Sequence, residues 1–215
     1  MRIIDLTHTI SGDMPVYPGT EGPQLSAANT YENDGFRETL LHMYSHTGTH
    51  MDAPSHLFPG ALSLDQKNAS AFVGTACIID ASDVRPGETI GLSYLDRNRE
   101  RVERAEFILF RTGWEQYWGQ EAYFGAYPVI SEEVAAYLVT HKKKGVGLDN
   151  IGLDPIADAR LTLHRIVLAD GGMVILENLC NLAQIGDAEF LLAALPLKYE
   201  NADGAPVRAI AILQN

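Results

Sequence analysis

We predict an α/β fold: a single compact domain built on a mixed β-sheet. Apolar runs of strand length alternate along the chain with segments of helical character, which is typical of α/β domains. The N-terminal half and the C-terminal end are rich in strands and leave room for hairpins, and this favours a mixed sheet over a purely parallel one. The chain has 215 residues, of which 46% are hydrophobic, and can bury a substantial core, so we expect residues 1–215 to form one unit.

Seven short apolar runs have the length and composition of strands. They lie at Met1–Ile10, Val73–Asp80, Glu106–Arg111, Gly145–Asp149, Met173–Glu177, Glu189–Leu197 and Val207–Leu213. The clearest helix signal runs from Ser131, a good N-cap, to about Lys143, and weaker signals mark Tyr94–Arg104 and Ala157–Leu168. Residues 12–24 are rich in proline and glycine, which indicates a rigid, irregular loop.

The chain carries a formal net charge of −12 at pH 7, and its only basic run is Lys142–Lys144. Because nucleic-acid affinity depends on clustered Lys and Arg, we expect no nucleic-acid partner and interpret the run as a helix C-terminus. Asp5 interrupts the apolar start, and no stretch of about 20 apolar residues follows, so we expect a cytoplasmic protein without a membrane span. Cys77 and Cys180 are far apart and are interpreted as unpaired thiols in a reducing compartment.

The segment from His46 to His56 contains three histidines and one aspartate in eleven residues. Imidazole and carboxylate groups at this density suit a divalent cation better than a hydrophobic core. Two other interpretations are a histidine-rich surface loop and a structural zinc site. The chain has only seven histidines, so three in one short segment would be a rare accident. Structural zinc sites are usually closed and rich in cysteine, whereas this segment has none, so an open, catalytic site for Zn, Mn or Fe(II) is favoured.

Only a bent segment can bring these four side chains together. In an extended strand, the first and last histidines would share a face but lie roughly 33 Å apart. On a helix, His46 and His50 would share a face, whereas Asp52 would point nearly opposite to His50. Gly48 tolerates unusual dihedral angles and Pro54 fixes its own φ, so both fit a bend. We therefore expect a loop.

His46, His50 and Asp52 leave at least one coordination position to be filled by water or from elsewhere in the chain. His164 and Glu177 are the best candidates, because each is a ligand type placed against an apolar segment, where burial without a partner is costly. From its local sequence, His164 could equally be an ordinary hydrogen-bonded histidine. The five residues together could bind two ions that share Asp52 as a bridge, at a separation of roughly 3.5–4 Å.

Five motifs give the chain a resemblance to a known family over essentially its full length. They are His46-x-Gly48-Thr49-His50-x-Asp52-x-Pro54-x-His56, Ile4–Thr7, Pro15–Gly19, Arg111–Trp114 and Glu177–Leu179. With them the chain resembles the cyclase superfamily of metal-dependent hydrolases, of which bacterial kynurenine formamidase is the best-known member. The resemblance implies a swivelling β/β/α-type fold. It also implies a homodimer or larger homo-oligomer, in which the neighbouring subunit often helps to close the pocket.

The resemblance assigns a role to each residue of the predicted site. It implies two metal ions, zinc with manganese as the alternative, that share Asp52. The first ion would be bound by His46, Asp52 and Glu177, and the second by His50, Asp52 and His164. His56 would then be the catalytic acid/base and not a ligand.

The implied function is hydrolysis of an aromatic amide by water that a divalent cation activates. The leading hypothesis is an arylformamidase that converts N-formylkynurenine to kynurenine and formate, with His56 moving the proton from water to the leaving nitrogen. A second hypothesis is opening of a cyclic amide or ester, such as an isatin-like lactam. A third is a metal-binding protein without catalysis.

Two departures from the family pattern leave the substrate open. Asp149–Asp154 keeps both aspartates of a family stretch but changes the residues between them, and Thr20 replaces a common aspartate. Tyr17, Phe36 and Trp114 are candidate pocket walls for an aromatic substrate.

Overall fold

The computed structural model describes residues 1–214, and its centre is an eight-stranded sheet. In spatial order the strands are β1 (Arg2–Asp5), β12 (Gly204–Leu213), β11 (Phe190–Pro196), β5 (Val73–Asp80), β7 (Phe107–Arg111), β9 (Gly145–Leu148), β10 (Val174–Glu177) and β4 (His50–Asp52). An additional pairing between β4 and β12 closes seven of these strands into a ring, with β1 added on the outer side of β12.

Both strand directions occur in the ring, so the predicted α/β class with a mixed sheet is confirmed. Strands β5, β7, β9 and β10 run parallel to one another. Antiparallel pairings join β11 to β5, β11 to β12, and β4 to both β10 and β12. All seven apolar runs of the sequence contain a strand.

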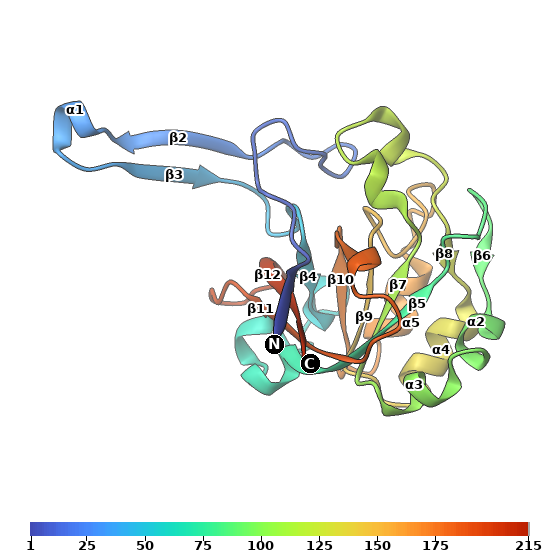
Figure 1. Ribbon diagram of the computed structural model, residues 1–215. Coiled ribbons are helices and arrows are strands. Elements are labelled where there is room, and N and C mark those ends of the chain that lie inside the picture. The colour runs from blue at the N-terminus through green and yellow to red at the C-terminus, as the bar shows by residue number, and fades with distance from the viewer. Residues whose placement is uncertain (215) are drawn as a thin grey trace.

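Four helices cover one side of the sheet (Figure 1). They are α2 (Leu92–Asp96), α3 (Arg99–Arg104), α4 (Glu132–Thr140) and α5 (Thr162–Leu168). Along β7, Ile108 and Phe110 join the core cluster that includes the helices, whereas Phe107 and Leu109 join a second cluster contributed by strands around the ring. Burial on both faces explains why this strand reads as a continuous apolar run. Within residues 1–214, none of the helices combines the length and the apolar character that crossing a membrane requires.

The helix predictions are confirmed with shorter boundaries. Ser131 caps α4, and its hydroxyl oxygen accepts the backbone N–H of Val134 at 3.3 Å. The helical signal at residues 94–104 belongs to two helices, α2 and α3, rather than one. The interpretation of the basic run was incomplete, because Lys143 is buried and donates to the carbonyl oxygens of Val102 and Ala105. Its cation therefore complements the C-terminus of α3, not of the helix that precedes it.

Sequence analysis did not anticipate a long hairpin that projects from the body of the molecule (Figure 1). It consists of β2 (Gln24–Asn29), the short helix α1 (Tyr31–Asp34) and β3 (Glu38–His42). None of these three elements has a buried residue. We call residues 24–42 the arm. A further small pairing joins β6 (Thr89–Ile90) to β8 (Val129–Ile130).

Candidate metal centre

The histidine-rich segment bends at the predicted glycine and then forms a short strand. Gly48 has φ +65°, a conformation that favours glycine, and a Cβ there would lie 3.1 Å from the Met14 side chain. The prediction of a loop throughout was wrong, since His50–Asp52 is β4. Successive strand side chains alternate between faces, so His50 and Asp52 share one face while Met51 enters the core. Pro54 opens a 3₁₀ turn that ends at His56.

Strand pairing brings Glu177 to this segment. β10 ends at Glu177, which lies directly opposite His50 in the β4–β10 pair. The Glu177 Oε2 atom is 3.4 Å from His50 Nε2, and Oε1 is 3.1 Å from His164 Nε2, on α5. The backbone N–H of Leu153 donates to Oε1 at 2.6 Å and fixes that carboxylate. Residues separated by more than a hundred positions therefore meet at one end of β4.

Asp52 lies between two groups of potential ligands. Its Oδ1 atom is 2.6 Å from His46 Nδ1 and 3.2 Å from His50 Nε2, and its Oδ2 atom is 3.3 Å from His164 Nε2. Within each of the groups His46/His50/Asp52 and Asp52/His164/Glu177, the ligand atoms all lie within 4.8 Å of one another. The resemblance implied a different division, with Glu177 beside His46 and His50 beside His164. The assignment of ligands to individual ions stays a prediction.

Hydrogen bonds orient two of the imidazoles toward Asp52. His50 donates from Nδ1 to the Gly48 carbonyl oxygen at 2.8 Å, so its Nε2 atom faces the carboxylates. His164 is held in the same way by Asp154, whose Oδ2 atom is 2.6 Å from His164 Nδ1. Asp154 also accepts the backbone N–H groups of Leu163 and His164, which ties it to the start of α5. Ligand histidines in metalloproteins are typically held by such partners on the ring nitrogen that does not bind the metal.

A third carboxylate, that of Asp203, faces the cluster from the other side of His46. His46 Nε2 lies 3.1 Å from Asp203 Oδ2, so each ring nitrogen of His46 faces a carboxylate. The His56 ring lies 4.1 Å from the His46 ring, between centroids, and its Nδ1 atom is 3.9 Å from Asp203 Oδ2. Gly204 makes room for this arrangement, because a Cβ there would lie 2.4 Å from the His46 ring.

The donor set fits a divalent cation. His50, Asp52, His164 and Glu177 are each at most 5% exposed. Buried carboxylates and imidazoles at this density are costly unless they pair or bind a metal. Three imidazoles and two carboxylates, with His56 and a cavity beside them, match an open catalytic site for Zn, Mn or Fe(II) better than a closed structural one.

Comparison with known proteins agrees with this geometry. The model of the Cyclase family, described as "Putative cyclase", matches residues 4–155. The chain is 32% identical over 209 residues to a kynurenine formamidase of Bacillus cytotoxicus, and the match covers 96% of this chain and 95% of the relative. The chain belongs to the Cyclase family. The kynurenine formamidase of Bacillus mycoides is equally similar.

Solved structures of similar fold belong to hydrolases as well. Isatin hydrolase A from Labrenzia aggregata, bound to benzyl benzoate, has a TM-score of 0.87 and 27% identity, and the match covers 100% of this chain and 94% of that one. A "predicted metal-dependent hydrolase" from Bacillus stearothermophilus has a TM-score of 0.80 and 25% identity, with 98% and 97% covered. The predicted enzyme class, a hydrolase of carbon–nitrogen bonds other than peptide bonds, is thereby confirmed.

A cavity of 680 Å³ opens onto the candidate ligand cluster of this Cyclase-family chain. Its walls include Tyr17, Tyr44 and Ile156, together with His46, His50, Asp52, His56, His164, Glu177 and Asp203. Of the three aromatic residues predicted as walls, Tyr17 lines it. The other two were wrong: Trp114 is buried in the core and donates its indole N–H to the Tyr123 carbonyl oxygen, and Phe36 lies exposed in the arm.

Close packing of opposite charges shifts the pKa values of the cluster. Burial alone would lower the pKa of His46, but Asp52 and Asp203 on either side of its ring raise it to about 10. Burial would raise the pKa of Asp52, but His46 and His50 hold it well below its usual range. Burial lowers the pKa of His56 below 6.5 despite the opposing charge of Asp52. A half-buried cationic His46 and a largely neutral His56 therefore lie side by side at pH 7.

Sequence analysis missed three residues that shape this site. Asp203 follows a polar turn, and Asp154 was noted only as part of a family stretch. Asn178 has φ +56° and donates from Nδ2 to the Gly48 carbonyl oxygen that also accepts from His50. Its position directly after Glu177 was the one available signal, because Asn is among the few residues that tolerate a left-handed conformation.

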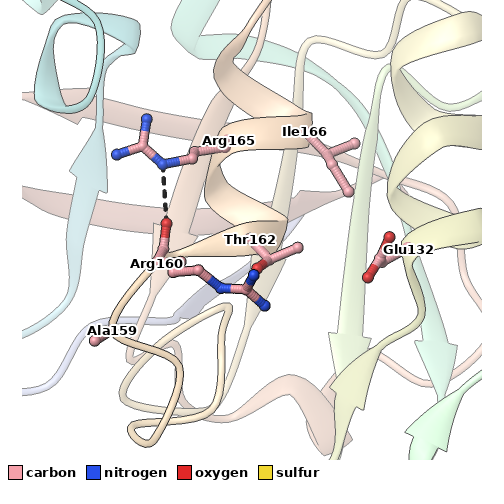
Figure 2. Close-up of a pocket in the computed structure, with 6 residues that line it drawn as sticks. All are labelled: Glu132, Ala159, Arg160, Thr162, Arg165 and Ile166. Atoms are coloured by element: carbon pink, nitrogen blue, oxygen red, sulfur yellow. Dashed lines mark hydrogen bonds between the residues drawn. The ribbon is translucent and has the colours of Figure 1, made fainter.

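A shallower hollow of 760 Å³ lies apart from the candidate ligand cluster (Figure 2). Glu132, at the start of α4, faces it together with Arg160, Thr162, Arg165 and Ile166 from α5 and the segment before it. Two of its lining residues are joined by a hydrogen bond from Arg165 Nε to the Arg160 carbonyl oxygen, 2.9 Å. Glu132 is the only carboxylate lining it, and it contains no histidine, so we place the chemistry in the cavity beside Asp52.

Proposed function

We propose that this chain is a metal-dependent arylformamidase, which hydrolyses an N-formyl aryl amine such as N-formylkynurenine to the free amine, kynurenine, and formate. The observation that carries the proposal is the convergence of three imidazoles and two carboxylates beside a largely apolar cavity. A further histidine, His56, lies next to this group and is not one of the five predicted ligands. The 32% identity to kynurenine formamidases over nearly the whole chain supports the same substrate class.

In this proposal, His46, His50, Asp52, His164 and Glu177 bind one or two divalent cations, zinc first and manganese as the alternative. A divalent cation held by these residues would lower the pKa of water toward about 7 and would polarise a substrate carbonyl. The protein fixes the ligand geometry through the Gly48 carbonyl oxygen and the Asp154 carboxylate. The side chain of Tyr17 and the apolar wall at Ile156 would pack against the aryl ring.

His56 is proposed as the acid/base. Its pKa lies below 6.5, so the neutral ring accepts a proton from the attacking water near pH 7. The same proton then passes to the departing amine nitrogen as the carbon–nitrogen bond breaks. Water supplies the oxygen of formate and both protons that the products gain, so the reaction consumes no further reagent.

The decisive variant is His56→Ala. We expect kcat for formate release to fall by about 10²–10⁴, the usual contribution of a general acid/base, while metal content stays at the wild-type level. Formate is measured by a coupled assay and metal by elemental analysis of the same samples. Unchanged turnover would remove His56 from the mechanism. Bound metal without hydrolysis of any activated amide or ester by the wild type would favour a non-catalytic metal-binding protein.

A second candidate is hydrolysis of an isatin-like lactam at the same site. It is favoured by the TM-score of 0.87 to isatin hydrolase A, obtained over the whole chain. The two activities use the same attack on an amide carbonyl and differ in whether the amine leaves. A comparison of kcat/KM for N-formylkynurenine and for isatin decides between them.

We also propose that the chain forms a homo-oligomer through its arm. A lone two-stranded hairpin is only marginally stable in water, yet the arm forms paired strands with exposed Leu25, Leu40 and Leu41. A second copy of the chain would cover these side chains. The cytoplasmic location and the absence of a nucleic-acid partner stay predictions from sequence.

A further inference from the structure

We propose that Asp203 is a positioning residue, whose one carboxylate orients both His46 and His56. The inference rests on the proposed function, because it gives these two histidines their roles as ligand and acid/base. Asp203 Oδ2 is 3.1 Å from His46 Nε2 and 3.9 Å from His56 Nδ1. The two imidazoles lie next to each other, with ring centroids 4.1 Å apart, so a single oxygen atom reaches toward both.

The backbone holds Asp203 in register with the ligand strand. Its carbonyl oxygen accepts the N–H of Ala53 at 2.8 Å, directly after β4. Gly204, the next residue, pairs with Asp52 at the start of β12. The closure of the ring by β12 and β4 therefore places the Asp203 carboxylate on one side of His46 and the Asp52 carboxylate on the other.

Two hydroxyl groups fix the Asp203 side chain. The Tyr199 hydroxyl lies 3.0 Å from Oδ1 and 2.5 Å from the Gly204 carbonyl oxygen, so these two acceptors share its one proton. Ser45 donates to Oδ2 at 3.3 Å, and Oδ2 is the atom directed at the histidines. Ser45 directly precedes His46, so the same contact ties the carboxylate to the chain that carries the ligand.

The geometry divides the work between the two nitrogens of His46. Its Nδ1 atom faces Asp52 at 2.6 Å, where the ligand atoms converge, and its Nε2 atom faces Asp203. A histidine that binds a cation through one nitrogen keeps its proton on the other, and the acceptor of that proton sets the ring orientation. Asp203 is the only carboxylate that the described structure places within hydrogen-bond distance of His46 Nε2.

His56 lies farther from Asp203 than His46 does. A separation of 3.9 Å exceeds a hydrogen bond, but catalytic hydrogen bonds are often long in free enzymes and shorten in the reacting complex. Acceptance of the Nδ1 proton by Asp203 would leave the Nε2 lone pair for the water proton. Asp203 itself touches no reacting atom in this scheme, so it positions the acid/base and does not replace it.

The test is Asp203→Asn, with Asp65→Asn as the matched control. Asp65 lies in the 3₁₀ turn Leu64–Gln66, and its Oδ1 atom accepts the N–H of Ala202, next to Asp203, but no contact joins it to either histidine among the described residues. Removal of an outer partner of a ligand histidine typically weakens metal binding or activity 10–100-fold. We expect Zn²⁺ or Mn²⁺ affinity in a chelator competition titration to fall by about that factor in Asp203→Asn only.

Two further readouts separate positioning from a structural effect. At saturating metal, kcat of Asp203→Asn should fall by about 10-fold or more while KM stays at the wild-type value. In ¹⁵N–¹H spectra of the metal-loaded protein, wild-type His46 should show a protonated Nε2, and this signal should be lost or shifted in the variant.

Each outcome decides the proposal. Wild-type metal affinity and kcat in Asp203→Asn would overturn it, as would an equal loss in Asp65→Asn. Loss of one metal ion per chain with an unaltered His46 spectrum would make Asp203 a ligand instead. If wild-type protein hydrolyses no amide but Asp203→Asn still binds metal more weakly, the proposed function fails while the positioning of His46 stands.

Discussion

His8 shows how one residue outside the metal cluster can set a pH limit on stability. Its ring stacks on Trp118 with centroids 3.8 Å apart and planes 3° from parallel. Its Nε2 atom is buried without a hydrogen-bond partner among the described residues. Burial lowers the pKa of His8 to about 4. The folded protein therefore favours the neutral ring at any pH above about 4.

This shift predicts loss of stability at mildly acidic pH. The pKa of His8 in the folded protein lies below the value of about 6.5 in the unfolded chain. The neutral ring therefore makes its full contribution to the free energy of unfolding above pH 6.5, and this contribution is lost as pH falls toward 4. Allowing for partial exposure of the ring, we expect a cost of about 1–2 kcal/mol between pH 7 and pH 4.5. His8→Phe keeps the stacking without the titration, so urea midpoints at the two pH values should differ less than in wild type. Equal pH dependence in both proteins would contradict this account.

At the level of single residues, the sequence revealed the candidate ligands but not the groups that orient them. His46, His50 and Asp52 were recognisable because they crowd one short segment around a glycine. Asp203 lies in an ordinary polar turn, and its role depends on a pairing between β4 and β12 that no local pattern encodes. The contacts of such outer residues are long-range, so only the folded structure shows them.

At the level of elements, the arm gives the sharpest prediction. Leu25 and Leu41 pair across its strands and therefore project from the same face. Their exposed fractions are 45% and 51%, so the pair presents an apolar surface to the solvent. We expect wild-type protein to be a dimer or larger in light scattering, and Leu25→Ser with Leu41→Ser to shift it toward the monomer. Leu197→Ser, at an exposed position outside the arm, should not.

A monomeric wild-type protein, or an arm variant that keeps the wild-type mass, would show that the arm does not mediate assembly. Circular dichroism of both variants checks that the body stays folded.

The element predictions also show where prediction from sequence patterns fails. Buried strands such as β5 and β7 were recognisable from continuous apolar runs, whereas the arm strands mix polar and apolar residues without a core to order them. β4 was missed because it is three residues long and two of them are polar site residues.

At the level of the whole molecule, closure of the sheet creates the site. β4 lies between β10 and β12, and these neighbours place Glu177 and Gly204 beside the ligand strand. α5 adds His164 from the helical layer. A mixed sheet could be predicted from the alternation of strands and helices, but not its closure, since the pairing of β4 with β12 joins segments about 150 residues apart. The proposed function therefore depends on the most non-local feature of the fold.

The central claim is that the closed sheet assembles a site for divalent metal around Asp52. The most direct measurement is anomalous diffraction from crystals grown with zinc, recorded on both sides of the zinc absorption edge. The account predicts a strong peak within coordination distance of an Asp52 carboxylate oxygen and of at least two of His46, His50, His164 and Glu177, and loss of that peak in Asp52→Asn. A well-ordered structure with these side chains in place and no peak beside Asp52 would contradict it.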